Sequence, residues 1–280
     1  MSIWSHTVVK NEDRYVWYSL MSVIDYVDRM LVWDTGSTDK TIDIIRYIQK
    51  RFPKKLDFVE VGDVSIDEFT HVRQQMLEQT KSDWVLILDG DEVWWDDSIK
   101  RITDLINSHG HLFESIITRY VNVVGDIYHY QEEAAGKYSI DEHKGHVTIR
   151  AMNMSIPGLK VDKPHGQQGF FDKNGILIQY RDYNKRKYIP ELGYMHFTHL
   201  PRSTRRESEA NVPKRLMKYK HEIGISFPKD FYYPEVFFRE RPEIVDSVWR
   251  KMDMQFFLSS LIQTPLRKIK RRIYEGKSGY

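Results

Sequence analysis

Three acidic residues, Asp89, Asp91 and Glu92, directly follow an apolar run at 84–88. Gly90 separates the two aspartates, and because glycine lacks a Cβ the chain can turn there and let another group approach closely. Two carboxylates aimed into one small volume repel each other unless a cation lies between them. Mg²⁺ and Mn²⁺ prefer carboxylate and phosphate oxygens and keep open positions for substrate, so the pattern indicates a metal site that binds a polyphosphate. The alternative is a solvated turn, which short acidic motifs often are.

The apolar run WVLIL at 84–88 is the element that must position these carboxylates. Its length and unbroken hydrophobicity are typical of a strand that is buried on both faces of a parallel sheet. In open α/β sheets, ligands bind outside the carboxyl ends of the strands. The acidic cluster therefore follows the strand at the end where a ligand would bind.

Strand and helix patterns alternate through the first third of the chain. Strands are expected at four places: 3–9, 30–33, 56–61 and 84–88. The segments between them carry apolar residues at helical spacing, such as Val16, Leu20 and Val23 after the first strand. This alternation predicts a parallel, doubly wound sheet with right-handed crossovers.

The pattern changes after residue 110. Further strands are expected at 116–124, 147–152 and 176–178, and a basic helix at 202–221. Polar loops rich in glycine and charge separate the strands. We interpret this part as a mixed or antiparallel elaboration of the same sheet.

The composition of the 280-residue chain, 41% hydrophobic and 29% charged, is ordinary for a globular protein. With 42 basic and 40 acidic side chains the net charge is +2, too small for a general attraction to nucleic acid. Cysteine is absent, which excludes disulfides, thiolate zinc sites and cysteine nucleophiles. Because no signal-peptide pattern is found and no apolar run approaches the roughly 18 residues of a membrane span, we expect a cytoplasmic protein.

Polar residues follow three of the expected strands. The first strand leads into Lys10-Asn11-Glu12, the second ends at Asp34, and the fourth ends at Asp89. Because the carboxyl ends of parallel strands meet at one edge of a sheet, these side chains are expected to lie together. Such an edge is where a nucleotide would bind.

Four segments together resemble the amino-terminal half of family 2 glycosyltransferases with the GT-A fold: VVKNE, VDRMLVWDTGSTDKT, a helix with Arg73, and DWVLILDGDE. The resemblance covers about residues 5–100 in order and spacing. It implies an α/β fold, with a Rossmann-like, mostly parallel sheet flanked by helices, a mixed-sheet elaboration and a helical C-terminal tail. It also implies inverting transfer of a sugar from a nucleotide-diphosphate sugar, expected to be UDP-linked, to a saccharide or lipid-linked acceptor.

The resemblance divides the chain and assigns roles to individual residues. Residues 1–110 would be the nucleotide-sugar-binding half of one domain, 111–225 its acceptor-binding half, and 226–280 an aromatic loop and a basic amphipathic helix. The residues expected to bind the nucleotide sugar are Val9, Asn11, Glu12, Asp34, Arg73, Asp89 and Gly90. Asp91 would bind Mn²⁺ or Mg²⁺. Many relatives have two successive aspartates where this chain has Asp34 followed by Thr35.

An inverting displacement also needs a general base for the acceptor hydroxyl. Related sequences often carry a His-Glu pair in the second half, whereas this chain reads VDKPHG at 161–166, without the glutamate. Asp162 and His165 are therefore the candidates for the base. The acidic residues held in reserve are Glu132, Glu133, Asp141 and Glu142.

Two histidines at 193–199, GYMHFTH, are candidates for a late metal ligand. If this segment is extended, His196 and His199 lie on opposite faces of the strand. Similar enzymes have a histidine here that touches the metal or the diphosphate, and we assign that role to His199. Arg202, Arg205 and Arg206 follow closely and could hold phosphates. The alternative is that both histidines are ordinary core or surface residues.

The tail after residue 243 combines apolar and basic residues. Phe256, Phe257 and Leu258 begin an apolar stretch, and a basic stretch at 267–272 follows it. This order is typical of a helix that lies on an anionic membrane surface, which would place the protein at the inner face of the membrane. The alternative is a helix docked on the domain with one solvated basic face.

Two other functions compete with sugar transfer. Nucleotidyl transfer would favour a glycine-rich, basic loop after the first strand, and KNEDRY is not such a loop. A degenerate transferase fold that only binds a sugar or nucleotide is favoured by the missing glutamate of the His-Glu pair.

Overall fold

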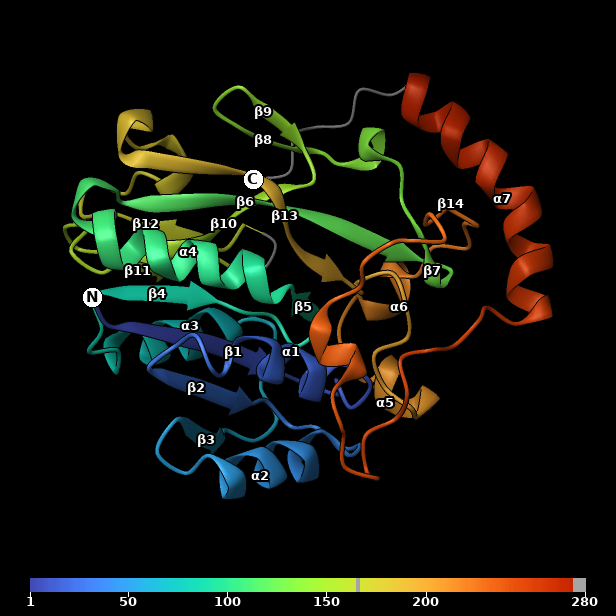
Figure 1. Ribbon diagram of the computed structural model, residues 1–280, viewed down its shortest axis with the longest axis horizontal. Helices are drawn as coiled ribbons and strands as arrows, with labels where there is room; N and C mark the ends of the chain where they lie inside the picture. Colours follow the sequence, from blue (N-terminus) through green and yellow to red (C-terminus); the bar gives the residue numbers. More distant parts are fainter. Residues whose placement is uncertain (165–166, 274–280) are drawn as a thin grey trace.

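A computed structural model describes residues 1–164 and 167–273 of the chain (Figure 1). Its centre is a set of four parallel strands in the order β3-β2-β1-β4. Their bounds are Ile3–Val9 for β1, Arg29–Asp34 for β2, Leu56–Glu60 for β3 and Trp84–Ile87 for β4. The sheet predicted for the first third of the chain is thus confirmed, and β1, β2 and β4 end side by side.

The second half of the chain extends the same sheet beyond β4. β10 (Val147–Asn153) pairs antiparallel with β4 and β6 (Ser115–Val124), and β7 (Asp126–Tyr130) and β14 (Ile225–Ser226) follow. β13 (Arg186–His196) runs parallel to β6 and antiparallel to β5 (Glu92–Trp94). The expected mixed elaboration of the sheet is confirmed.

Two small hairpins lie outside the main sheet. One pairs β8 (Tyr138–Ile140) with β9 (His143–Gly145). The other pairs β11 (Lys160–Asp162) with β12 (Gly169–Phe171).

Helices cover both faces of the parallel strands, α1 and α4 in front of the sheet and α3 behind it in Figure 1. The helices that follow the first four strands are α1 (Val16–Val23), α2 (Thr41–Arg51), α3 (Phe69–Glu78) and α4 (Asp96–His109). Trp84 and Leu86 of β4 join the core cluster that includes α1, α2 and α4, whereas Val85 and Ile87 join a second cluster on the opposite face. The prediction that this strand is buried on both faces is therefore confirmed.

The expected strand at 176–178 is wrong. Ile178–Tyr180 forms a short 3-10 helix instead. The side chain of Asp172 accepts hydrogen bonds from the backbone N–H groups of Asn174 and Ile176, each at 2.9 Å. These local bonds hold a turn where the sequence pattern indicated sheet pairing.

The expected basic helix at 202–221 is also wrong. The segment forms two short helices, α5 (Arg206–Ala210) and α6 (Arg215–Lys218). Pro213 lies between them and has no N–H to continue a helix, and Lys214 has a left-handed φ of 59°. The break lets individual arginines of this segment turn inward.

The described part of the chain ends in the predicted C-terminal helix, α7 (Met254–Ile273), which contains Pro265. In Figure 1 it stands apart from the parallel strands, on the side of the molecule toward which β1, β2 and β4 point. None of the helices in the described part of the chain has the length and apolar character that crossing a membrane requires.

Candidate functional site

The ends of β1 and β4 approach each other closely at Gly90. A Cβ built on this glycine would lie 2.9 Å from Val9 Cγ1 and 3.1 Å from Glu12 Cγ, so a larger residue would push the two strand ends apart. The hydroxyl of Ser19 on α1 donates to the carbonyl oxygen of Asp89 at 2.9 Å and holds the turn from the other side. The requirement for glycine between the two aspartates is thus a packing requirement.

Two arginines contact Asp89, and one of them, Arg150, also contacts the buried Glu92. Arg73 Nη2 lies 3.1 Å from Asp89 Oδ1, and Arg150 Nη2 lies 3.2 Å from Asp89 Oδ2. Arg150, on β10, also forms an ion pair with Glu92. Burial by itself would raise the pKa of Asp89, but the two guanidinium groups outweigh it and lower that pKa to about 2. Burial raises the pKa of Glu92 well above its ordinary range despite Arg150.

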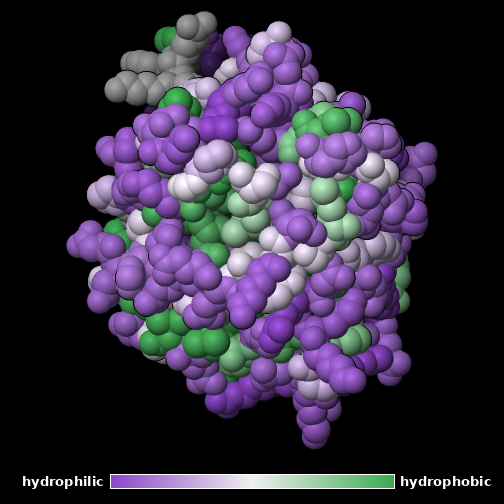
Figure 2. Space-filling model, turned by 90° about the vertical axis from the view of Figure 1, so that its left-hand side faces the viewer, coloured by the Kyte–Doolittle hydropathy of each residue, from purple (hydrophilic) through white to green (hydrophobic). Residues whose placement is uncertain are grey.

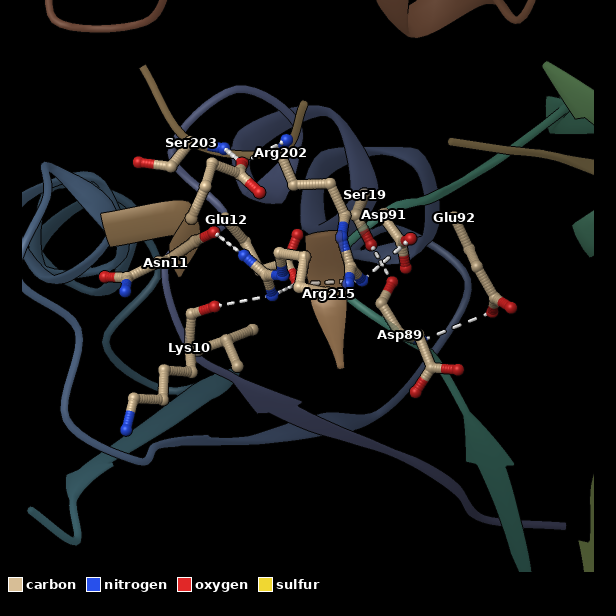
Figure 3. A network of polar contacts seen from close by, with 12 residues as sticks. Lys10, Asn11, Glu12, Ser19, Asp89, Asp91, Glu92, Arg202, Ser203 and Arg215 are labelled. Atoms are coloured by element: carbon tan, nitrogen blue, oxygen red, sulfur yellow. Dashed lines mark hydrogen bonds and ion pairs between the residues drawn. The ribbon is translucent and has the colours of Figure 1, made fainter. Parts of the chain in front are cut away.

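Asp91 and Glu12 form a second, deeper network with Arg202 and Arg215 (Figure 3). Arg202 Nη1 donates to Asp91 Oδ2 at 2.9 Å and lies 3.1 Å from Glu12 Oε1. Arg215 Nη2 lies 2.6 Å from the same Glu12 oxygen and 2.7 Å from the carbonyl oxygen of Lys10. Two guanidinium groups from the carboxyl-terminal part of the chain are thereby held at the end of β1.

The two acids of this network have opposite pKa shifts. Burial would raise the pKa of Asp91, but Arg202 and His196 lower it well below its ordinary range. For Glu12 burial is the larger effect and raises the pKa to about 8, although Arg202 and Arg215 oppose it. Glu12 Oε2 is buried without a hydrogen-bond partner in the described part of the chain. Asp91 therefore carries the fixed negative charge of the network.

Asn11 and Asp34 shape the turns after β1 and β2. Asn11 has a left-handed φ of 55°, and its side-chain oxygen accepts from the N–H of Thr38 at 2.7 Å. Asp34 Oδ1 accepts from the N–H groups of Gly36 and Ser37, each at 2.9 Å. Its other oxygen, Oδ2, is buried with no partner among the residues described, and burial raises the pKa of this carboxyl. Such an oxygen could accept from a ligand N–H or O–H.

The carboxyl-terminal part of the chain covers this edge of the sheet. Asn11 Nδ2 donates to the carbonyl oxygen of Ser208 at 2.7 Å, and Arg205 Nη1 donates to that of Thr38 at 3.0 Å. As a result Asn11 is fully buried and Asp34 is 1% exposed. A nucleotide that reached these residues would have to replace contacts made by α5 and the loop before it.

His196, and not His199, faces Asp91. His196 is the last residue of β13, and its Nε2 lies 3.6 Å from Asp91 Oδ2. His199 lies beyond the strand, where Nδ1 bonds the carbonyl oxygen of Lys218 at 2.9 Å and Nε2 lies 3.0 Å from Lys220 Nζ. Burial, followed by Lys220, lowers the pKa of His199 to about 2. Both its ring nitrogens therefore have partners within the protein, and His196 is the histidine that lies beside Asp91.

Asp91 and His196 are two neighbouring side chains whose atoms could hold a divalent cation. Nδ1 of His196 is buried without a partner in the described chain, which leaves Nε2 pointing toward Asp91. Within the described residues, no group of three or more histidine, aspartate or glutamate side chains is arranged to hold a metal ion. Two protein donors suit an ion such as Mn²⁺ or Mg²⁺ that takes its remaining ligands from phosphate and water. Arg202 occupies one Asp91 oxygen and would have to share it.

The base candidate Asp162 lies beside the helix that carries Arg73. The backbone N–H of its neighbour Val161 donates to Gln74 Oε1 on α3 at 2.7 Å. The carboxylate itself is half exposed and paired with Lys160 at 2.6 Å, and this hydrogen bond lowers the pKa of Asp162. His165, the other candidate, lies outside the described residues.

The acids held in reserve are mostly engaged elsewhere. Glu132 pairs with Arg271 at 2.9 Å, Glu133 with Arg119 at 3.6 Å, and Asp141 with Arg186 at 2.5 Å. Glu142 is exposed and lies 3.6 Å from His143.

Sequence reasoning did not single out Arg150 or Arg215. A signal for Arg150 was present, because an arginine inside the strand pattern VTIRAMN needs a nearby carboxylate if the strand is buried. Arg215 gave no such signal, since it is one of several basic residues in a segment that resembles a solvated helix. Only the break between α5 and α6 turns it toward Glu12.

The fold and site define an α/β protein whose parallel strand ends carry buried acids and arginines at the place where such sheets bind nucleotides. Residues 6–173 match the family model described as glycosyl transferase family 2. Because this match spans more than half of the chain, the protein belongs to that family of glycosyltransferases.

Curated relatives match only part of the chain. The glycosyltransferase SunS of Bacillus phage SPbeta is 30% identical over 90 residues, which are 31% of this chain and 19% of SunS. A TPR repeat-containing protein of Synechococcus elongatus is 34% identical over 85 residues, 30% of this chain and 19% of that protein. The chain thus aligns with about a fifth of the length of these relatives.

Solved structures that resemble this chain share little sequence identity with it. TarS 1–349 of S. aureus in complex with UDP-GlcNAc is 14% identical, with a TM-score of 0.49, over 70% of this chain and 58% of TarS. Glucosyl-3-phosphoglycerate synthase of Mycobacterium tuberculosis with Mn²⁺ and UDP-glucose is 14% identical, with a TM-score of 0.41, over 70% of this chain and 71% of that one.

The low pKa of Asp89 makes folding stability depend on pH. Folding lowers this pKa from its ordinary value of 3.8 to about 2, so the unfolded chain takes up a proton first as the pH falls. The stabilisation is complete above about pH 4 and is lost as the pH falls through about 2. We expect the thermal midpoint of the wild type, followed by circular dichroism, to fall more steeply over this window than that of Asp89→Asn. The exposed Asp230→Asn is the control, and equal slopes for wild type and Asp89→Asn would contradict the assignment.

Proposed function

We propose that the protein transfers a sugar from a nucleotide-diphosphate sugar to an acceptor hydroxyl with inversion at the anomeric carbon. Membership of glycosyl transferase family 2 supports the reaction class. The observation that carries the proposal is the convergence of Asp91, His196 and Arg202 beside the ends of β1 and β4. This arrangement can hold a cation and a diphosphate at the edge of the sheet where a nucleotide binds.

Stabilisation of the leaving group is the main chemical task of such a site. As the nucleoside diphosphate departs, negative charge grows on its β-phosphate. A bound Mn²⁺ or Mg²⁺ would supply a positive charge that bridges the phosphates. Asp91 and His196 would hold that ion, and Arg202 and Arg215 already place two further positive charges beside them. Both guanidinium groups can form paired hydrogen bonds to phosphate oxygens.

The turns after β1 and β2 would orient the nucleoside. Asp34 Oδ2 and Glu12 Oε2 are buried oxygens without partners in the described part of the chain, and a ligand N–H or O–H would satisfy them. Arg73 and Arg150 hold Asp89, the first acid of the cluster, for the ribose. We propose a UDP-sugar as the donor and a saccharide or lipid-linked hydroxyl as the acceptor.

Asp162 is the base we propose for the acceptor. Its position beside α3 supports this role, because Arg73 of the same helix reaches Asp89 and Gln74 bonds the residue before Asp162. The half-exposed carboxylate is open to an incoming hydroxyl. The proton of that hydroxyl would pass to Asp162 as the oxygen attacks the face of the sugar opposite the diphosphate.

A binding module without catalytic activity is the second candidate. Arg202 bonds the metal-facing oxygen of Asp91, and the segment at 161–166 lacks the glutamate that related sequences often carry. If Arg202 stays in place, it neutralises Asp91 and leaves no charge for a metal. Turnover distinguishes the two candidates, since a binding module would retain the nucleotide sugar without breaking it.

Asp91→Asn tests the metal-dependent step. We expect Mn²⁺-dependent release of UDP from a UDP-sugar to fall about 10²–10³-fold, because the substituted amide no longer supplies the charge that holds the ion. Asp83→Asn, an exposed aspartate before the same strand, should retain wild-type rates. Nucleotide-sugar binding in a thermal-shift assay without any UDP release by the wild type would favour the binding module instead.

His196→Ala and His199→Ala separate the two histidines. We expect His196→Ala to raise the Mn²⁺ concentration for half-maximal activity roughly tenfold or more, since one donor is lost. His199→Ala should keep the Mn²⁺ dependence and lower the unfolding free energy by about 1–3 kcal/mol, because the carbonyl oxygen of Lys218 loses its partner. The reverse pattern in a metal titration would return the role to His199.

Asp162→Asn and Lys160→Met test the base. The first should lower transfer about 10²–10⁴-fold while the KM for the donor stays unchanged. The second removes the hydrogen bond that lowers the pKa of Asp162, so the acidic limb of the pH profile of kcat/KM should move to higher pH. Wild-type transfer by Asp162→Asn would exclude this carboxylate.

A further inference from the structure

The C-terminal helix α7 packs on the protein through its polar face. The side chains turned inward are spaced three to four residues apart: Phe256, Ser260, Thr264, Arg267 and Arg271. Ser260 is fully buried, and the Thr264 hydroxyl accepts from the N–H of Ile223 at 3.1 Å. Arg271 Nη2 lies 2.6 Å from Glu222 Oε2, a side chain that is 1% exposed. These contacts fix the rotation of the helix about its own axis.

The apolar face of α7 therefore points away from the protein. Its large apolar side chains are all exposed: Met254, Phe257, Leu258, Leu261, Ile262, Leu266, Ile269 and Ile273. Ile262 is 72% exposed and Ile273 is 70% exposed. In an ordinary surface helix the apolar stripe faces the core, so the orientation here is the reverse of the usual one.

Figure 2 views the face on the left of Figure 1, opposite to α7, where apolar patches lie among hydrophilic side chains. A continuous apolar stripe on one exposed helix is a feature of surfaces that bind another apolar phase or a partner.

Either a lipid surface or a partner protein could cover the apolar face of α7, and the charges on the helix distinguish between the two. No aspartate or glutamate occurs between Met254 and Ile273, whereas Lys268, Lys270 and Arg272 lie on or beside the apolar face. A second copy of the chain docked on this face would bring like charges together. An anionic lipid surface accepts both the apolar side chains and the positive charges.

We propose that α7 lies in the plane of an anionic membrane surface with its apolar face among the acyl chains. The protein itself anchors the polar face through Thr264 and Arg271, so the helix needs no rearrangement to present the apolar one. This docking is independent of the proposed sugar transfer. It explains why the apolar face of α7 is exposed. The sequence pattern alone was also compatible with a helix docked on the domain.

A series of contacts runs from α7 toward the candidate site. Glu222 holds Arg271 of α7, while Lys218 and Lys220, a few residues earlier, hold His199 at the end of the β13 segment. α7 also stands on the side toward which β1, β2 and β4 point (Figure 1). A membrane at α7 would therefore border the part of the protein where the strands end.

Vesicle flotation of the full chain tests the proposal. Wild type should float with phosphatidylcholine vesicles that contain phosphatidylglycerol, and weakly with phosphatidylcholine alone or at high salt. Ile262→Glu should lower the partition coefficient at least about tenfold, because a carboxylate replaces an inserted side chain. Lys270→Gln should lower it roughly fivefold on the anionic vesicles alone.

Leu112→Glu is the matched control, since it puts the same charge on another exposed apolar side chain, in the short 3-10 helix that follows α4. It should float like wild type, and thermal melts should show both variants folded. Flotation that does not depend on the anionic lipid, or that Ile262→Glu leaves unchanged, would overturn the proposal. So would a vesicle-free dimer in sedimentation velocity that Ile262→Glu dissociates, because a second copy would then cover this face.

Discussion

Neutralisation of buried carboxylates is the constraint on which the architecture of the site depends. Glu12, Asp91 and Glu92 are almost completely buried at the ends of β1 and β4, where an unpaired charge would be costly. Four arginines compensate them and Asp89: Arg73 from α3, Arg150 from β10, Arg202 from the segment after β13 and Arg215 from α6. The acids come from one compact stretch of the fold, and the arginines come from elements far apart in the sequence. The network therefore ties the mixed part of the sheet and the two short helices to the parallel strands.

The same network gives the site its chemical character. Arg202 pairs with the Asp91 oxygen that would bind a cation, and Arg215 pairs with the neighbouring Glu12, so a diphosphate would meet positive charge from both protein and ion. Under the proposed function, these arginines exchange carboxylate partners for phosphate oxygens when the donor enters. The segment that carries them also covers Asn11, so under that proposal donor entry would be coupled to a rearrangement of this segment. The exchange would replace one set of charge-assisted hydrogen bonds by another.

The helix α7 extends this coupling to the surface. Its arginine Arg271 neutralises Glu222, and the residues just before Glu222 hold His199 near the end of β13. Charge pairing thus fixes the orientation of an exposed helix as well as the site. The apolar face points outward because the polar face has specific partners on the protein.

The sequence by itself determined the parallel strands, the acidic cluster at their ends and the family resemblance. These features depend on local patterns: an apolar run such as Trp84–Ile87, the turn at Gly90, and helical spacing between strands. Tertiary structure alone decided which arginine meets which acid and that His196 rather than His199 faces Asp91. It also decided which face of α7 points outward. These outcomes depend on pairing between residues on different elements, such as Arg202 and Asp91, or on which side of a helix finds a partner, and no local pattern encodes that.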